Sequence, residues 1–324
     1  MFSSTDIEEN YVPKIIKKYI LLIMEIKPFV KWVGGKTQLL KDINNNLPDD
    51  LDIIDTYIEP FVGGGSVMFN VVPKLKNIKH VIINDLNSRL INVYNNIKYN
   101  HKDLLHKLGE LEIRYYHKTK NEQEHMYYEI RDDFNKYLNI PNNKNSIYYI
   151  NNAAQFIFLN KTCFNGLYRE NLTGKFNVPW NQSRKPLICD IENITKVHEF
   201  LNNYNVKCIV GDYQQVLDYV SENTFIYFDP PYRPLTETSA FTSYTKSKFN
   251  DESQKELKQF CDKLNDMNCK FLLSNSDPKN SKKTDNFFDD LYNKYNIIRV
   301  HAKRNINSDG TKRYKINELL ISNY

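Results

Sequence analysis

The chain has 324 residues, of which 41% are hydrophobic and 13% aromatic, and its net charge is +5. This composition excludes a disordered or fibrous chain and supplies core material for one large domain or two smaller ones. The positive charge permits a polyanionic partner without requiring one. The five cysteines are scattered with no C-x-x-C pair, which favours a reducing compartment and argues against a zinc site.

No apolar run approaches the length of a membrane span. The short apolar stretch at 15–23 is interrupted by two lysines and lacks a cleavage site, so it does not predict a signal peptide. We therefore expect an intracellular protein that is neither secreted nor bound to a membrane. Residues 1–26 precede the first motif, and we expect them to form an N-terminal extension.

A first glycine turn follows Trp32 and leads through Lys36 into a predicted helix over 38–45. A Gly-Gly-Lys-Thr sequence that opens a helix suggests a phosphate loop. The Walker spacing, however, needs glycine where Val30 stands, and no strand precedes it. The turn between Trp32 and Lys36 would instead suit an adenine ring and a small carboxylate.

Residues 53–70 predict a strand, a glycine turn at 63–65 and a helix, without the full G-x-G-x-x-G spacing of a dinucleotide site. Five of the ten glycines lie in these two turns, which indicates backbone close to a ligand. A second strand over 80–83 ends at Asp85. An acidic residue about 20 positions after a glycine turn often binds ribose hydroxyls. The alternative is that Asp85 caps a helix over 88–98.

The most informative stretch is an apolar run at 225–228 that ends in Asp229, Pro230, Pro231 and Tyr232. The run predicts a buried parallel strand, which the prolines end because they lack the N–H of the ladder. The stiff loop presents a carboxylate, the Pro230 carbonyl and an aromatic face. Two acceptors and a stacking face suit the exocyclic amine of a nucleobase. The alternative is an Asp-capped turn with a packed tyrosine.

Two further apolar strands, at 208–212 and 271–276, also end in polar residues. Five such strands predict an α/β fold with a doubly wound sheet and a site along its carboxyl edge. Two strands near the C-terminus, over 299–304 and 313–321, predict a closing hairpin whose basic loop tracks phosphates or is simply solvated.

Between residues 98 and 206 the chain is polar and rich in Tyr, Asn and Lys, with helices predicted over 101–116, 122–139 and 147–159. Amide, arginine and aromatic side chains between 160 and 180 are the kinds that contact base edges in a groove. A solvated helical insertion is the alternative.

Eight motifs occur in one order: Phe29–Lys36, Glu59–Ser66, Asn84-Asp85, Phe164–Arg169, Phe176–Pro179, Asp229–Tyr232, Phe241–Tyr244 and Leu273–Asn275. Through them the chain resembles the Dam-type (D12 class) adenine-specific DNA methyltransferases from about Lys27 to its end. The resemblance implies a Rossmann-like sheet at 27–97 and 207–324 that forms the catalytic domain. The inserted, mostly helical part at 98–206 would be the target-recognition domain.

The resemblance also implies the chemistry. S-adenosylmethionine would be the methyl donor and S-adenosylhomocysteine the product, without a metal. The substrate would be adenine N6 in double-stranded DNA, within GATC and reached by base flipping. We expect a monomer or weak dimer in the cytoplasm or nucleoid.

The matching positions imply three groups of site residues. The catalytic group is Asp229, Pro230, Pro231 and Tyr232. The cofactor group is Trp32, Lys36, Phe61, Gly63, Gly65, Asp85, Asp212, Tyr213 and again Asp229. The DNA-binding group is Lys31, Asn165, Leu167, Arg169 and Pro179. Ser183 departs from the family, which often has an aromatic residue there, and this leaves recognition of one base pair open.

Two other functions stay open. Cytosine N4 offers the same kind of amine to the same loop, and a catalytically idle DNA-binding module would keep the fold. Methylation of cytosine C5 is disfavoured because the chain contains no Pro-Cys dipeptide to supply its cysteine nucleophile.

Overall fold

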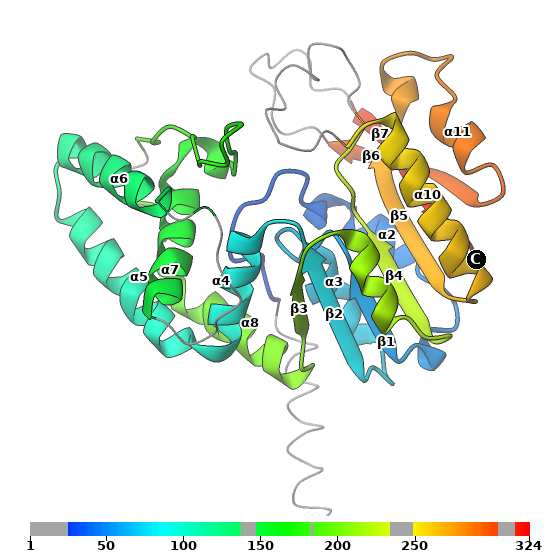
Figure 1. Cartoon of the computed structure of the whole chain (residues 1–324), viewed down its shortest axis with the longest axis horizontal. Coiled ribbons are helices and arrows are strands. Elements are labelled where there is room, and N and C mark those ends of the chain that lie inside the picture. The colour runs from blue at the N-terminus through cyan, green and yellow to red at the C-terminus, as the bar shows by residue number, and fades with distance from the viewer. Residues whose placement is uncertain (1–24, 137, 139–146, 183–184, 234–248, 304–314) are drawn as a thin grey trace, which may run out of the picture.

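A computed structural model describes residues 25–136, 138, 147–182, 185–233, 249–303 and 315–324 (Figure 1). Within these ranges the chain forms one seven-stranded sheet in the order β3-β2-β1-β4-β5-β7-β6. The strands are β1 (Thr56–Glu59), β2 (His80–Asp85), β3 (Lys207–Val210), β4 (Thr224–Phe228), β5 (Lys270–Ser276), β6 (Asn296–Lys303) and β7 (Lys315–Ser322).

The first five strands are parallel, and β7 runs antiparallel between β5 and β6. The strand order reverses between β1 and β4, because the chain builds outward to β3 on one side and to β5 on the other. In open α/β sheets the crevice for ligands lies at such a reversal, beyond the carboxyl ends of the strands. Glu59 ends β1 and Asp229 follows β4, so both lie at this point.

The predicted buried strand at 225–228 is confirmed as β4, in which all five residues are buried. Successive side chains point to opposite faces of a sheet, and the two hydrophobic clusters follow this alternation. Phe225 and Tyr227 belong to one cluster, whereas Ile226 and Phe228 belong to the other. The sheet is therefore covered on both faces, as a parallel sheet requires.

The helices cover the faces unequally (Figure 1). The helical elements are η1 (Lys36–Leu39), α2 (Leu40–Asn45), η2 (Leu51–Ile53), α3 (Ser66–Val71), η3 (Val72–Lys74), α4 (Ser88–Tyr99), α5 (His101–Tyr116), α6 (Lys120–Phe134), α7 (Ile147–Thr162), η4 (Phe164–Gly166), α8 (Ile191–Asn203), η5 (Tyr213–Tyr219), α10 (Asp251–Asp266), η6 (Pro278–Asn280) and α11 (Phe287–Leu291). One face of the sheet packs against η5, α10 and α11, and the other against α2, α3 and α4. Helices α5, α7 and α8 pack in turn on α4.

Figure 1 shows α5, α6 and α7 beside the sheet, on the side of β3. Their buried side chains belong to the same hydrophobic cluster as those of α3 and α4, so this region shares its core with the sheet. The domain boundaries at 98 and 206 remain a prediction. The helix predicted over 122–139 begins earlier and ends at Phe134. The helix predicted over 38–45 starts as the 3₁₀ turn η1 and continues as α2.

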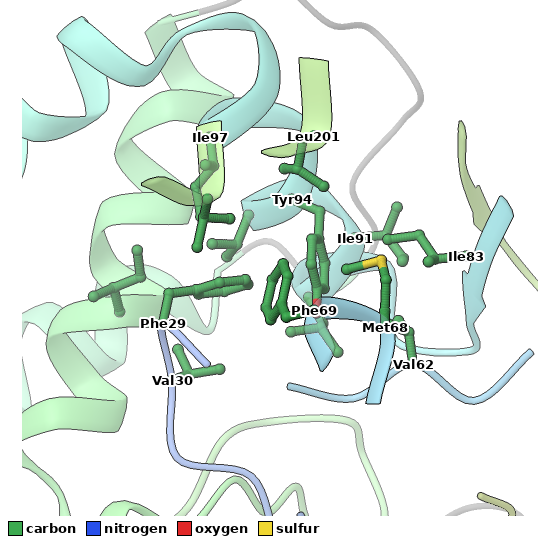
Figure 2. Close-up of a cluster of buried hydrophobic side chains, with 14 of the residues drawn as sticks. Phe29, Val30, Val62, Met68, Phe69, Ile83, Ile91, Tyr94, Ile97 and Leu201 are labelled. Atoms are coloured by element: carbon green, nitrogen blue, oxygen red, sulfur yellow. The ribbon is translucent and has the colours of Figure 1, made fainter. Parts of the chain in front are cut away.

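Figure 2 shows the part of the core that fixes the first motif and the glycine turn. Phe29 packs edge-to-face on Tyr94 of α4, with ring centroids 4.8 Å apart. Val62 and Met68, from the turn and from α3, lie in the same cluster. Each fully buried side chain of this size contributes roughly 1.5–3 kcal/mol. The segment before η1, with Phe29, and the segment before α3, with Val62, therefore both pack against α4.

The predicted C-terminal hairpin is confirmed by β6 and β7, which pair antiparallel from Asn296–Ser322 to Lys303–Lys315. Several predictions fall outside the described residues: the extension up to residue 24, Ser183, Phe241–Tyr244 and the hairpin loop at 305–312. Of the helices that the structure does describe, none has the length and apolar run needed to cross a bilayer.

Candidate functional site

We call the carboxyl ends of β1, β2, β4 and β5 the carboxyl edge. An ion pair lies at its centre. The Lys36 ammonium lies 2.7 Å from Asp229 Oδ1, with side-chain exposures of 4% and 21%. Lys36 also donates to the Gly34 carbonyl at 2.5 Å. Ser274 of β5 donates its hydroxyl to Asp229 Oδ1 at 3.1 Å. The carboxylate is therefore oriented from two sides and remains partly open to a ligand.

Tyr232 lies beside this pair. The Lys36 ammonium is 4.6 Å from the centroid of its ring, which is cation–π distance. Arg233, the next residue, donates to both oxygens of Asp251 at 2.6 and 3.0 Å and to Asp285 at 2.7 Å. These bonds anchor the end of the Asp229–Tyr232 loop to the start of α10. Pro230 is buried, whereas Pro231 is exposed and its carbonyl accepts from Gln254.

Burial shapes the charges of this cluster. It raises the pKa of Asp229, and the Lys36 charge and the Ser274 hydrogen bond oppose that shift. Burial raises the pKa of Glu59, at the end of β1, to about 8, and the negative charge of Asp229 adds to the effect. The Tyr57 hydroxyl donates to Glu59 at 2.7 Å. With one ammonium close to two buried carboxyl groups, Glu59 is the group that keeps its proton at neutral pH.

The glycine turn of the second motif lies against Trp32. Gly63 has φ +48°, and a Cβ there would fall 2.6 Å from the indole of Trp32. Gly65, at φ +75°, caps α3, and a Cβ there would meet the Tyr94 hydroxyl at 2.6 Å. Tyr94 also donates to the Gly63 carbonyl at 3.0 Å. The turn thus needs glycine both for its backbone angles and for its close packing.

Asp85 reaches this turn from the end of β2. Its carboxylate accepts from the Gly63 N–H at 3.1 Å and from the Asn87 N–H at 2.9 Å. Burial raises its pKa to about 6, so the carboxylate is ionised and accepting at neutral pH. The alternative role as a helix cap is not observed, because the Asn87 side chain caps α4 instead.

Hydrogen bonds from Asn84 connect the ends of β1, β2 and β3 next to Asp85. The buried Asn84 amide donates to the carbonyls of Pro60 and Gly211, at 3.1 and 3.0 Å. Phe61 and Tyr213 follow these carbonyls, and their ring centroids lie 5.3 Å apart. Phe61 is partly exposed, whereas Tyr213 is buried.

Asp212, the last member of the predicted cofactor group, is exposed at the start of η5. It caps that turn by accepting from the Gln214 N–H at 2.9 Å. It therefore lies at the same edge of the sheet as Asp85, where it stabilises the start of η5.

Trp32 connects the carboxyl edge to the 163–180 loop, which follows α7. Its ring stacks on Tyr168 of that loop at 5.4 Å, and Tyr168 stacks in turn on Phe156 of α7 at 4.9 Å. Asn160 of α7 strengthens the connection. It accepts from the Lys31 N–H at 2.9 Å and donates to the carbonyls of Lys31 and Gly166 at 2.9 and 3.0 Å. The residue before Trp32 is thus bound to the loop.

The predicted DNA-binding side chains lie in and around this loop. Lys31, Asn165, Arg169 and Pro179 are exposed, and Leu167 is partly exposed. Asn165 has φ +57°, and Arg169 Nε donates to Asn177 Oδ1 at 2.8 Å. A Cβ on Gly166 would fall 2.4 Å from the Lys31 side chain. The structure therefore brings Lys31 against the 163–180 loop, although more than 130 residues separate them in sequence.

No group of three or more His, Cys, Asp or Glu side chains suited to a metal occurs among the described residues. A surface hollow of about 330 Å³ lies elsewhere, at the amino ends of β2 and β3. It is lined mainly by Lys79, His80, Asn205, Lys207 and Tyr219. None of the predicted site residues lines it.

Sequence reasoning named no site role for four residues of this region: Glu59, Asn160, Arg233 and Glu318. Glu59 lies inside one of the eight motifs, and a charged residue on a predicted buried strand could have marked it as a site residue. Arg233 directly follows Tyr232. Asn160 and Glu318 reach the site only through tertiary packing, so no local pattern marks them.

Comparison with known proteins agrees with this geometry. Residues 32–306 match the family described as D12 class N6 adenine-specific DNA methyltransferase. The Type II methyltransferase M.MjaIII of Methanocaldococcus jannaschii is 46% identical over 304 residues, covering 93% of this chain and 100% of that protein. The Type II methyltransferase M1.LlaDCHI of Lactococcus lactis subsp. cremoris is 34% identical over 301 residues, covering 93% and 96%.

The DNA adenine methylase of Escherichia coli strain K12 is 31% identical over 294 residues, which cover 91% of this chain and 94% of the relative. The family match spans most of the chain, and these relatives align along almost their whole length. The chain is therefore an enzyme that belongs to the D12 class of N6 adenine-specific DNA methyltransferases.

Proposed function

We propose that the enzyme transfers a methyl group from S-adenosylmethionine to N6 of adenine in double-stranded DNA, within GATC. The observation that carries this proposal is the cluster of Asp229, Lys36 and Tyr232 at the reversal of strand order. A partly exposed carboxylate beside an aromatic ring, on a loop held by two prolines, suits an exocyclic amine on a purine.

The residues around the glycine turn fit the methyl donor. Asp85 is ionised at neutral pH, so it accepts hydrogen bonds from ribose hydroxyls. Gly63 lets the backbone approach the ligand closely, and Trp32 covers the turn. The neighbouring rings of Phe61 and Tyr213 supply aromatic surface suited to the adenine of the donor. S-adenosylmethionine, when bound, supplies a methyl group made electrophilic by its sulfonium, and this chemistry requires no metal.

The Asp229 loop acts on the target amine. The adenine must leave the duplex stack, which costs a few kcal/mol, and it then stacks on Tyr232. Asp229 and the Pro230 carbonyl accept its two N–H groups, which orients the nitrogen lone pair toward the methyl carbon. The displacement is direct and in line, so it requires no covalent bond to the chain. The bond from sulfur to the methyl carbon breaks as the bond from N6 to that carbon forms, S-adenosylhomocysteine leaves, and the methylated nitrogen releases one proton to solvent.

The 163–180 loop, with Lys31, reads the DNA. Exposed Asn165, Arg169 and Pro179 are available to base edges and phosphates, and Arg169 is pre-oriented by Asn177. We propose that 98–206 acts as the target-recognition domain of a monomer or weak dimer. Resemblance to GATC-modifying enzymes supports that recognition sequence.

The test uses the purified chain, methyl-labelled S-adenosylmethionine and a duplex that contains GATC, followed by nucleoside analysis. A duplex of the same composition with every GATC scrambled is the control. We expect label in N6-methyladenine from the first duplex alone. Label in N4-methylcytosine, or none at all, would contradict the proposed reaction. Equal amounts of N6-methyladenine in both duplexes would contradict GATC as the recognition sequence and would still agree with methylation of adenine.

A further inference from the structure

Glu318 lies in β7, outside every motif that marks the site, yet the topology brings it to the carboxyl edge. β7 pairs antiparallel with β5, and Glu318 stands opposite Ser276, the last residue of that strand. On its other side it stands opposite Val300 of β6. The side chain is partly buried. The insertion of β7 beside β5 therefore adds a third carboxyl group to the region of Asp229 and Glu59.

This carboxyl group makes one short hydrogen bond, to the residue proposed to hold the base. The Tyr232 hydroxyl donates to Glu318 Oε2 at 2.6 Å. Burial raises the pKa of Tyr232 well above its usual value, and the charges of Asp229 and Glu318 add to that effect. The phenol therefore stays protonated and remains a donor. Burial raises the pKa of Glu318 as well, and its carboxyl oxygen accepts from the phenol in either protonation state.

Two contacts together fix the Tyr232 ring. One tyrosine torsion sets the direction of the ring and the other sets its rotation about the Cβ–Oη axis. A cation over the face restrains that rotation, and an acceptor at the hydroxyl holds the direction and, because the phenol O–H prefers the ring plane, restrains the rotation as well. The Lys36 ammonium lies 4.6 Å from the ring centroid, and Glu318 binds the hydroxyl at the far end. The same Lys36 neutralises Asp229 at 2.7 Å. The ring plane and the Asp229 carboxylate are therefore set by one connected group of side chains.

We propose that Glu318 is a positioning residue that orients the Tyr232 ring for the extruded adenine. The inference rests on the proposed function, in which Tyr232 stacks on that base. Glu318 acts through the tyrosine hydroxyl and does not touch the reacting atoms. Its loss lets the ring turn away from the plane that the base requires, so the productive arrangement is populated less often.

The test is a double-mutant cycle on Glu318→Ala and Tyr232→Phe, with Glu318→Gln as the conservative variant. Each single variant removes the same hydrogen bond, so we expect kcat to fall about tenfold in each. The double variant should be no slower than the worse single variant, because the interaction is lost only once. Glu318→Gln retains an acceptor oxygen and should recover most of the rate.

The Michaelis constants separate positioning from general damage to the fold. KM for the cofactor and for DNA should remain within about twofold of the wild-type values, since neither ligand is bound chiefly by Glu318. Tyr295→Phe is the matched control for Tyr232→Phe. It removes a comparable tyrosine–carboxylate bond, 2.7 Å long, to Asp262 of α10, away from the carboxyl edge. It should lower thermal stability and leave kcat unchanged.

Several results would overturn the inference. Glu318→Ala with wild-type kcat would do so, as would a double variant whose losses multiply. Glu318→Gln as slow as Glu318→Ala would show that the charge, and not the hydrogen bond, matters. A wild-type enzyme that forms no N6-methyladenine would instead contradict the proposed function, which separates the two failures.

Discussion

Polar groups at the carboxyl edge are held by other parts of the chain, whereas those of the 163–180 loop are presented to solvent. Lys36 is buried, and Asp229 and Asp85 are partly buried and doubly hydrogen-bonded. In the loop, Asn165 and Arg169 are exposed on a backbone fixed from beneath by Asn160 and the Trp32–Tyr168 stack.

The difference fits the ligands that we propose for the two regions. A reacting group must be oriented before its ligand arrives, and burial strengthens its electrostatic effect. A surface that reads DNA must leave its donors free for base edges, so only the backbone beneath them is fixed. Substitutions at the carboxyl edge should therefore alter chemistry, cofactor affinity and pH dependence, whereas those in the loop should alter affinity for DNA alone.

Among substitutions that leave the Asp229 carboxylate in place, the largest expected effect comes from Gly63→Ala. The backbone has φ +48°, and the added methyl group would fall 2.6 Å from the Trp32 indole. We expect affinity for S-adenosylhomocysteine, measured by calorimetry, to fall about a hundredfold, which corresponds to about 2.7 kcal/mol.

Gly109→Ala is the control, because a Cβ there meets no atom within 4 Å inside α5. It should stabilise the fold by about 0.5–1 kcal/mol without affecting the ligand. Unchanged affinity in Gly63→Ala would remove the turn from the cofactor site.

A smaller effect concerns Glu59 and pH. Its pKa is raised from 4.5 to about 8, chiefly by burial. A raised carboxyl pKa means that the folded state holds the proton more tightly. The resulting stabilisation is complete below the unfolded pKa and is lost as the pH rises through 8. The free energy of unfolding should therefore fall by about 2 kcal/mol between about pH 6.5 and 8.5.

Glu59→Gln carries no titrating proton and should remove most of that slope in denaturant titrations. Asp85, whose pKa is about 6, titrates mainly below this window and is shared by both proteins. Parallel pH profiles for the wild type and Glu59→Gln would show that Glu59 is ionised in the folded state. Burial at the carboxyl edge would then not shift the pKa of Glu59, and this electrostatic difference between the carboxyl edge and the exposed loop would not exist.

The smallest effect is expected in the loop, from Arg169→Ala. Arg169 is exposed, and within the described ranges its hydrogen bonds go to Asn177 of its own loop. DNA affinity should fall about tenfold, with weaker discrimination between GATC and single-base variants, while stability changes by less than about 0.5 kcal/mol. Fluorescence anisotropy measures the affinity, and Arg114→Ala on the exposed side of α5 is the control. A loss of kcat at saturating DNA would break the contrast between the two regions.

Local patterns were sufficient to predict the strands and their polar ends. The run at 225–228 and the prolines after Asp229 required only the spacing of apolar residues and the missing proline N–H. Asp85 could be placed at the glycine turn because parallel strands end at one edge. Its alternative role as a cap was wrong, because Asn87 stands nearer the helix and its amide oxygen reaches two backbone N–H groups.

The rest depended on contacts between distant segments. Glu318 reaches Tyr232 because β7 inserts between β5 and β6, and the hairpin pattern did not reveal that order. Asn160 lies on an apolar helix whose sequence does not show that it binds Lys31. The pKa of Glu59 results from burial and from Asp229, 170 residues away in sequence. Such features arise from tertiary packing, which no local window contains.

The central claim is that the Asp229 carboxylate drives methyl transfer to adenine N6. Its most direct test is single-turnover transfer by Asp229→Ala, with Asp55→Ala at the amino end of β1 as the control and far-UV circular dichroism to verify the fold. We expect the rate of Asp229→Ala to fall roughly a thousandfold with its helix and strand content intact, and that of Asp55→Ala to remain unchanged. A folded Asp229→Ala enzyme that methylates adenine at the wild-type rate would contradict the account.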